Sequence, residues 1–258
     1  MTTNDLSKDA NKLAELANDN LELLNGMCQD KIETQDYYLG VLRKQAILHL
    51  DLSAILENRD RQYISTPFII LRSLIDDFLH LLYLESKIDK EIEIIKINAA
   101  SYKHVFKSLN NLEVSNFKYF DSKYPHYFSN EQLKEFMNQF LSKEENKKYF
   151  KNIDTFKFKS FMNFSEMIKC ISYSRNVNIF RDRAFYLWKE FSSFVHYSNY
   201  TFEYELNNSE VSLQMIDESF QYCYNSIYLS FKYFEREFEM TFKDNVVLRK
   251  KYGIIHEC

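Results

Sequence analysis

The chain has 258 residues, of which only three are glycine and two are proline, and its formal net charge at pH 7 is −4. Glycine and proline together make up about 2% of the chain, against roughly 12% in average proteins, and β-sheets depend on turns that use these residues. The composition therefore excludes a sheet-rich protein and predicts an all-α fold. The weak negative charge provides no general attraction to nucleic acid or to an anionic membrane.

The four cysteines are widely separated and form no CxxC pair; they are Cys28, Cys170, Cys223 and Cys258. Cysteines of this kind are typical of reduced, mostly buried thiols in a cytoplasmic protein, and their spacing matches no metal-binding motif. The N-terminal segment is polar and acidic, unlike a signal peptide. We therefore expect a cytoplasmic protein with neither a metal nor a cofactor.

Apolar residues recur at helical spacing through most of the chain. The predicted helices, in chain order, cover residues 5–30, 34–58, 66–84, 87–112, 129–141, 164–174, 182–197 and 209–243. The first four have short connections, which favours an antiparallel bundle. The last is ~50 Å long at ~1.5 Å per residue, which is enough either to support a homo-oligomer or to carry an inserted region.

The predicted helix 66–84 is almost entirely apolar, and we expect it to lie in the core. Thr66 suits the N-cap and Pro67 the first helical position. One polar stripe interrupts the helix, and it consists of Arg72, Ser73, Asp76, Asp77 and His80. Each charge at mid-span would cost about 2.5–3.5 kcal/mol in a bilayer, so this is not a membrane helix. Once buried, such a stripe must be paired or perform chemistry.

Residues 113–160 differ in character from the rest, with many aromatic residues, Pro125, and six lysines against three acids in the segment 143–159. A capping box of Ser129 and Gln132 predicts one short helix there. We interpret 113–160 as an insertion or lid on a single domain that spans 1–258.

The lysines of this segment alternate with aromatic residues, which suggests a nucleic-acid contact. Lys147, Lys148 and Lys151 would hold a single-stranded backbone while Tyr149 and Phe150 stack on bases. The alternative, which we favour, is a solvated lid whose aromatic rings pack onto the bundle.

The polar stripe allows two interpretations besides catalysis. Asp77 and His80 have the acid-x-x-His spacing of di-metal helical bundles, but the sequence contains no second pair of this kind. A simpler arrangement pairs Arg72 with Asp76 at i,i+4, with His80 satisfied nearby.

Ser193 and His196 share one face of the predicted helix 182–197. A serine nucleophile normally requires a strained turn and an oxyanion hole, and the sequence shows neither. The simpler role for His196 is that of a helix-end residue whose positive charge suits the helix dipole.

The segments LRSLIDDFLHLLYL and YLWKEFSSFVHYS together resemble a family of bacterial all-helical proteins of the HEPN-like superfamily. The resemblance covers about residues 35–235. It implies that the site consists of Arg72, Asp76, Ser193 and His196. We would expect a glutamate at position 76, and aspartate is shorter by one methylene group.

HEPN ribonucleases carry an Arg-x4-6-His motif, in which the histidine moves the proton of a ribose 2′-hydroxyl and the arginine stabilises charge on the phosphate. The resemblance therefore implies metal-independent RNA cleavage by a homodimer in a toxin or phage-defence system, with an antitoxin or other protein partner. Arg72 with His196 is our first choice for this pair, and Arg43 with His49 is the second. The alternative to an enzyme is a helical interaction or assembly module in which the Arg/Asp/His residues form a buried structural network.

Overall fold

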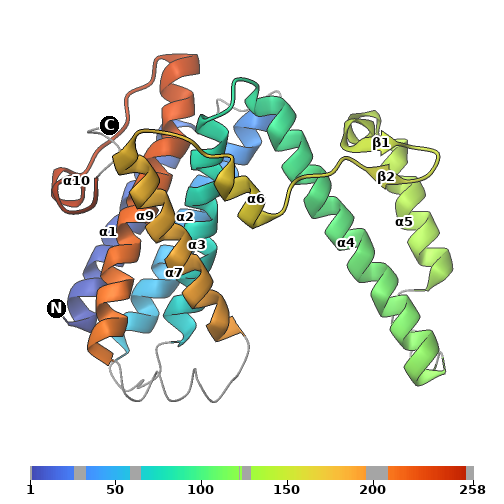
Figure 1. The fold of residues 1–258 in the computed structure, drawn as a ribbon, viewed down its shortest axis with the longest axis horizontal. Helices are drawn as coiled ribbons and strands as arrows, with labels where there is room; N and C mark the ends of the chain where they lie inside the picture. The colour runs from blue at the N-terminus through green and yellow to red at the C-terminus, as the bar shows by residue number, and fades with distance from the viewer. Residues whose placement is uncertain are drawn as a thin grey trace. The chain divides into compact units, whose positions relative to one another are not determined.

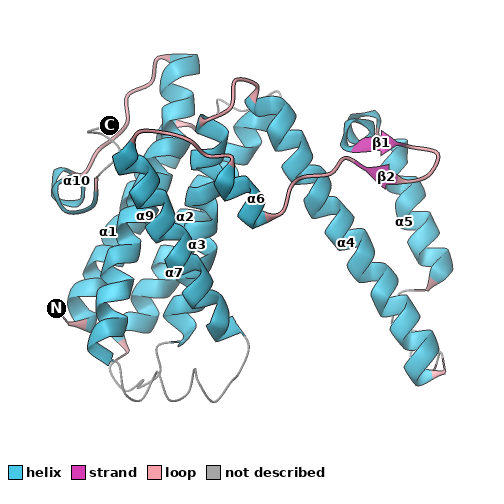
Figure 2. Ribbon diagram, in the orientation of Figure 1, coloured by secondary structure: helices cyan, strands magenta, loops and turns pink. Residues whose placement is uncertain are grey.

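A computed structural model of the chain describes residues 2–25, 33–58, 65–121, 123, 129–195 and 209–253. Its α-helices are α1 (Thr3–Leu23), α2 (Glu33–Glu57), α3 (Ser65–Glu85), α4 (Lys90–Phe120), α5 (Asn130–Ser142), α6 (Phe164–Lys169), α7 (Arg175–Ser192), α9 (Ser209–Phe238) and α10 (Val246–Tyr252). Two 3₁₀ turns, η1 (Glu144–Tyr149) and η2 (Ser193–Val195), and two short strands, β1 (Phe150–Asn152) and β2 (Lys157–Phe158), complete the described elements. Figure 2 shows this predominance of helix, which confirms the all-α prediction.

The chain folds into two compact units. The bundle unit contains residues up to Ile88 and from Phe164 onward, and the inserted unit contains Asp89–Asn163. This differs from the predicted single domain, in which the helix over 87–112 was a bundle helix and the insertion covered only 113–160. The physical reason is that α4 buries its apolar face against the aromatic residues of its own unit.

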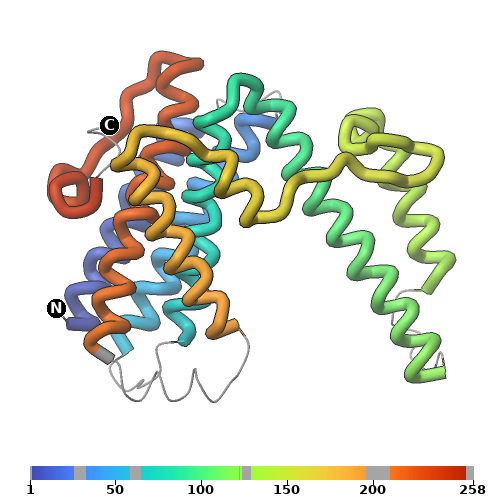
Figure 3. Tube along the Cα trace, viewed as in Figure 1, coloured from blue at the N-terminus to red at the C-terminus, as the bar shows by residue number. Residues whose placement is uncertain are grey.

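The helices of the bundle unit run alongside one another, and specific pairs fix their directions. Ser7 and Ser53 exchange hydroxyl-to-carbonyl hydrogen bonds of 3.0 and 2.9 Å, so the start of α1 lies beside the end of α2. Tyr38 stacks on Tyr233 with ring centroids 4.7 Å apart, which pairs the start of α2 with the end of α9. Figures 1 and 3 show the N-terminal α1 and the late α9 side by side.

Helix α3 occupies the centre of this bundle, in contact with α2, α7 and α9. Most of its apolar side chains are buried: Phe68 stacks on Phe191 of α7 at 4.5 Å, and Phe78 meets Tyr222 of α9 at 5.4 Å. The helix begins at Ser65, so it includes Thr66, the predicted N-cap. Because three helices surround α3, its polar stripe must lie against neighbours as well as against solvent.

The inserted unit has an aromatic core of its own. It is built on Ala99 and Phe106 of α4, Leu133 of α5, and residues of η1 and the hairpin, namely Tyr149, Phe150 and Phe158. The hairpin turns at Phe156, which has a positive φ of 47°. Strands of three and two residues are too short to produce a recognisable alternation, which is why the sequence did not predict them.

The predicted last helix, 209–243, ends earlier than expected. Helix α9 stops at Phe238, and Glu239 has a positive φ of 54°. The following segment is held by Asn20 of α1, whose side chain bonds both the N–H and the carbonyl of Lys243 at 2.9 and 3.0 Å.

Within the described ranges, no helix combines the length and apolar character needed to cross a bilayer.

Candidate functional site

The polar stripe of α3 faces two different neighbours. Residues 72, 76 and 80 recur every four positions and face α7 and α6, whereas Ser73 and Asp77, one position on, face α2. The stripe therefore divides into two groups with separate partners, which we call the α7-side group (Arg72, Asp76 and His80) and the α2-side group (Ser73 and Asp77).

Arg72 is held in one orientation by α7. Its Nε donates to Oγ of Ser192 at 2.9 Å, and its guanidinium carbon lies 4.9 Å from the ring centre of Trp188. The Ser192 hydroxyl in turn donates to the carbonyl of Trp188 at 2.7 Å. The terminal nitrogens of Arg72 donate to no acceptor among the described residues. They are not fully buried, so they reach solvent. The result is a fixed guanidinium with its two-nitrogen fork open to solvent.

Asp76 joins α3 to α7 through the indole of Trp188, whose Nε1 donates to Oδ1 at 2.9 Å. Its other oxygen, Oδ2, lies 3.3 Å from Nδ1 of His80, which also lies 2.9 Å from the Asp76 carbonyl oxygen. The expected i,i+4 pair with Arg72 is not formed among these contacts, because Trp188 and His80 occupy the carboxylate instead.

The two ionisable groups of this pair stabilise each other's charged form. Burial opposes ionisation of Asp76, but the hydrogen bond and charge of His80, together with the Lys44 charge and the Trp188 hydrogen bond, lower the Asp76 pKa. Burial likewise works against the imidazolium of His80, but the hydrogen bond and charge of Asp76 outweigh it and raise the His80 pKa. Phe164 of α6 covers this part of the site, stacked on Trp188 at 4.2 Å and 5.4 Å from the His80 ring.

The α2-side group forms an ion pair in which the carboxylate is mostly buried and the lysine is partly exposed. Lys44 of α2 donates from Nζ to Oδ1 of Asp77 at 2.8 Å and to the carbonyl of Ser73 at 3.1 Å. The other Asp77 oxygen, Oδ2, is buried and has no partner in the described part of the chain. Burial raises the pKa of Asp77 to about 6, against the opposing effect of the Lys44 charge. Asp77 therefore carries a proton more readily than an ordinary carboxylate.

Ser193, which the sequence proposed, does not contact Arg72. Its hydroxyl donates to the carbonyl of Glu190 at 2.6 Å, and its neighbour Ser192 makes the contact to Arg72. His196 lies outside the described residues, so the pairing of Arg72 with His196 stays a prediction.

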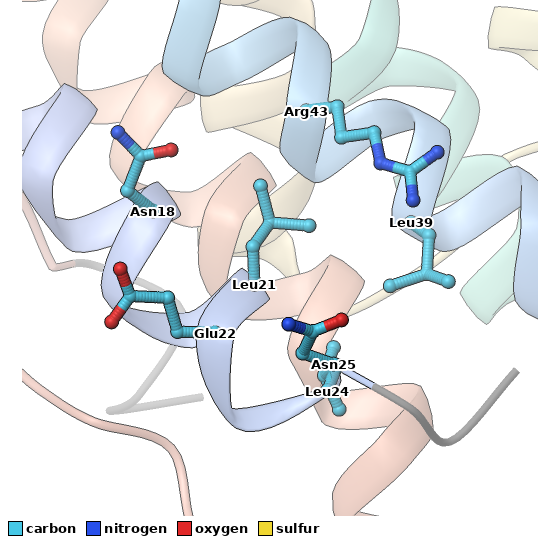
Figure 4. A pocket seen from close by; sticks show the side chains of 7 residues that line it. All are labelled: Asn18, Leu21, Glu22, Leu24, Asn25, Leu39 and Arg43. Atoms are coloured by element: carbon cyan, nitrogen blue, oxygen red, sulfur yellow. The ribbon is translucent and has the colours of Figure 1, made fainter.

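The second-choice pair, Arg43 and His49, is not brought together. Arg43 is exposed and lines a pocket of about 370 Å³ between α1 and α2, where Figure 4 shows it with Leu39 opposite residues of α1. His49 is fully buried, with Nδ1 2.6 Å from the Gln45 carbonyl and its Nε2 unpartnered among the described residues. Burial lowers its pKa to about 4, so His49 is neutral at pH 7 and belongs to the core.

The lysines proposed to bind nucleic acid are exposed in the inserted unit. Lys147 pairs with Glu144, Lys148 lies 5.4 Å from the ring centre of Tyr149, and Lys151 follows in β1. The neighbouring rings of Tyr149 and Phe150 are buried in the core of that unit. These two rings are therefore not available to stack on bases, and the lysines can contribute charge alone.

Sequence reasoning missed Ser192, Lys44 and the polar contact of Trp188. One signal was available: Trp188 and Ser192 are four residues apart, and a partly buried indole N–H requires an acceptor. The described residues bring no three His, Cys, Asp or Glu side chains together as a metal-binding group. Asp77 and His80 therefore have no further metal ligand beside them in the described part of the chain.

No protein-family model, curated protein or solved structure matches this chain. The resemblance of its two motifs to the HEPN-like superfamily therefore stays a prediction.

Proposed function

We propose that this protein is a HEPN-like ribonuclease that cleaves RNA without a metal ion, with Arg72 as the group that binds the scissile phosphate. The observation that supports the proposal is the open fork of Arg72, which Ser192 and Trp188 hold in place. Arginine binds phosphate through two parallel N–H groups, and a guanidinium that is already oriented loses little freedom on binding.

In the proposed reaction, the proton of a ribose 2′-hydroxyl passes to the imidazole of His196. The 2′-oxygen attacks the adjacent phosphorus, the bond to the 5′-oxygen breaks as that oxygen takes up a proton from water, and the imidazolium of His196 returns its proton to the solvent. The terminal nitrogens of Arg72 neutralise the charge that develops on the non-bridging oxygens. Asp76 and Ser192 act as positioning residues, because they hold Trp188 and Arg72 rather than the substrate.

The experiment incubates purified protein with end-labelled RNA in the presence of EDTA. We expect cleavage that leaves 2′,3′-cyclic phosphate ends, and loss of that cleavage in both Arg72→Ala and His196→Ala. Arg183→Ala is the matched control, because Arg183 lies on α7 and is exposed in a pair with Glu218. Wild-type protein without activity, or cleavage that survives both substitutions, would overturn the proposal.

The exposed lysines of the inserted unit are the proposed contacts to the RNA backbone. A Lys147→Gln, Lys148→Gln, Lys151→Gln variant should bind RNA more weakly and with a smaller dependence on salt, since fewer phosphates are neutralised. The decrease should be similar for all RNA sequences. An unchanged salt dependence would remove these residues from the proposed interface.

The setting that the resemblance implies is a cytoplasmic toxin or phage-defence system. In it the chain forms a homodimer and binds an antitoxin or another protein partner. Sedimentation equilibrium tests the dimer directly. Growth arrest on expression, absent for Arg72→Ala at equal protein level, tests the toxic activity.

A second candidate function is a non-enzymatic interaction or assembly module. The observation that favours it is the Trp188–Asp76–His80 chain, whose members bond to one another rather than to an open site. On this alternative, Arg72→Ala and Trp188→Phe would change stability and assembly, and no RNA would be cleaved under any condition.

A further inference from the structure

The pocket of about 370 Å³ between α1 and α2 has a lining suited to a small ligand (Figure 4). All the residues that line it belong to the last two turns of α1, the two positions that follow this helix, and the first half of α2. Its volume falls within the roughly 300–1,000 Å³ that is typical of small-ligand sites. The pocket is separate from the proposed ribonuclease site, because Arg72 and Asp76 of α3 face α7.

One part of the lining is apolar and consists of Leu21, Leu24 and Leu39. Leu24 and Leu39 are buried, with 2 and 6% of their surfaces exposed, and Leu21 is partly exposed. These three leucines, which we call the apolar wall, come from two helices that are packed against each other. Because packing holds the wall in place, it can receive the apolar part of a ligand without rearrangement.

Four polar side chains also line the pocket, and all four are exposed: Asn18, Glu22, Asn25 and Arg43. In the described part of the chain, none of these side chains has a hydrogen bond or an ion pair. Figure 4 shows Arg43 on one side of Leu21, and Asn18 and Glu22 on the other. The pocket therefore presents one cation and one anion at separate places, together with two amides.

Neither charge has an opposite charge nearby on its own helix. The positions three and four residues from Arg43 hold no acid, and those around Glu22 hold no base. Elsewhere on α1, by contrast, Lys12 pairs with Asp9 at 3.4 Å. Glu22 lies in the last turn of α1, which carries no basic residue, so its charge adds to the negative end of the helix dipole. This end of the pocket therefore attracts a cationic group.

We propose that this pocket binds a dipeptide whose C-terminal residue is apolar. The carboxylate of the dipeptide pairs with the guanidinium of Arg43, and its ammonium group lies beside Glu22 at the end of α1. The peptide group bonds to the amides of Asn18 and Asn25, which each offer a donor and an acceptor, and the apolar side chain lies on the apolar wall. One positive and one negative charge match a zwitterion better than a simple anion or cation.

The test is calorimetric titration of the full chain with alanyl-leucine, with its N-acetyl derivative, which lacks the ammonium group, and with its C-terminal amide, which lacks the carboxylate. We expect saturable binding of one dipeptide per chain, and binding of each derivative that is weaker by about tenfold or more. Alanyl-glycine lacks the apolar side chain and should bind about fivefold more weakly than alanyl-leucine. Free leucine is too short to reach both charges and should bind about tenfold more weakly.

Two substitutions at exposed positions assign each charge to one end of the dipeptide. Arg43→Gln should bind alanyl-leucine and its amide equally, because the carboxylate has lost its partner. Glu22→Gln should bind alanyl-leucine and its N-acetyl derivative equally, because the ammonium group has lost its partner. Arg175→Gln on α7 and Glu57→Gln at the end of α2 are exposed control variants, and both should bind as the wild type does.

Four results would each overturn the proposal. They are no saturable binding of alanyl-leucine up to about 10 mM, full affinity for either derivative, equal binding of free leucine, or wild-type affinity in Arg43→Gln or in Glu22→Gln. Circular dichroism of each variant establishes that it is folded. RNA cleavage is measured separately on the wild type, so failure at this pocket and failure of the ribonuclease proposal are distinguishable.

Discussion

The indole nitrogen of Trp188 donates a 2.9 Å hydrogen bond to Asp76, and this contact joins two segments that lie 112 residues apart in the chain. Each segment carries one of the two sequence motifs, so their proximity depends on the packing of α7 against α3. Trp188 is also the only tryptophan of the protein. Its fluorescence therefore reports on the centre of the candidate site.

Trp188→Phe tests the contribution of this bond. The ring stays, so packing against Phe164 is largely kept, but Asp76 loses a donor while remaining partly buried. We expect the free energy of urea unfolding, followed by circular dichroism, to fall by about 1–3 kcal/mol. Tyr186→Phe, at an exposed position on the same helix, should change it by less than about 0.5 kcal/mol. Equal stabilities of the two variants would contradict a role for the bond.

Arg72→Ala should destabilise the protein only moderately. The change removes one hydrogen bond to Ser192 and the stacking on Trp188, and it leaves no carboxylate without its partner. Each loss amounts to about 1 kcal/mol, so we expect a decrease of about 1–2 kcal/mol in the unfolding free energy. A decrease above about 4 kcal/mol is what loss of a buried charge pair produces, and it would contradict this arrangement of Arg72.

Arg72→Lys separates phosphate binding from stability. Lysine keeps the positive charge but cannot form the two-nitrogen fork. On the ribonuclease proposal, this variant should keep its melting temperature within a few degrees of the wild type and lose most RNA cleavage. Cleavage at the wild-type rate would show that a point charge is sufficient.

Asp77→Asn should change how stability depends on pH. The Asp77 pKa rises from 3.8 to about 6 on folding, so between these values the folded state binds more protons than the unfolded state. Stability should therefore fall as pH rises from about 4 to about 6, by roughly 2–3 kcal/mol from this group. Urea unfolding across this range should show the fall in the wild type and a flatter profile in the variant. A profile that is the same in both proteins would contradict the shift.

His80→Gln should act at higher pH, and here the protonated form that the fold favours is the charged imidazolium rather than a neutral acid. The His80 pKa is raised on folding, so its contribution to stability is complete below the unfolded value of 6.5 and is lost as pH rises through the folded value. We expect the wild type to lose stability above pH 6.5 and the variant to lose less over the same interval. An NMR titration of the imidazole measures the pKa directly, and a value at or below 6.5 would contradict this prediction.

Removal of the inserted unit should leave the bundle unit folded. The inserted unit has a core of its own, and the bundle unit consists of the two segments that flank it, up to Ile88 and from Phe164 onward. A Gly/Ser linker of about eight residues spans about 16 Å and can replace residues 89–163. We expect cooperative unfolding and an unchanged Trp188 emission maximum. Loss of cooperative unfolding would show that the bundle unit depends on the inserted one.

The helical character of the fold could be predicted because it follows from local properties. Scarcity of glycine and proline, together with apolar residues at helical spacing, placed α2 and α3 within about a residue of their observed ends. The partner of α4 could not be found in this way. Its repeat shows that one face is buried, but the same repeat fits a bundle core and the aromatic core of Phe106 and Phe150 equally well.

Within the candidate site, the sequence identified the polar stripe but not its pairing. Arg72 and Asp76 have ideal spacing for an ion pair, yet tertiary contact gives each a different partner on α7. The choice between Ser192 and Ser193 depends on the rotation of α7 about its axis, which periodicity does not determine to one residue. In α9, likewise, the spacing of apolar residues alone does not indicate that serines such as Ser219 are buried.

The nested arrangement of the two units has a consequence for synthesis on the ribosome. Residues 89–163 form one uninterrupted stretch, whereas the bundle unit needs α7 and α9, which are translated last. The inner unit can therefore acquire its structure while α3 still awaits α7 and α9. During that interval the apolar surface of α3 that these two helices bury stays uncovered, and the nascent chain is then most dependent on chaperones.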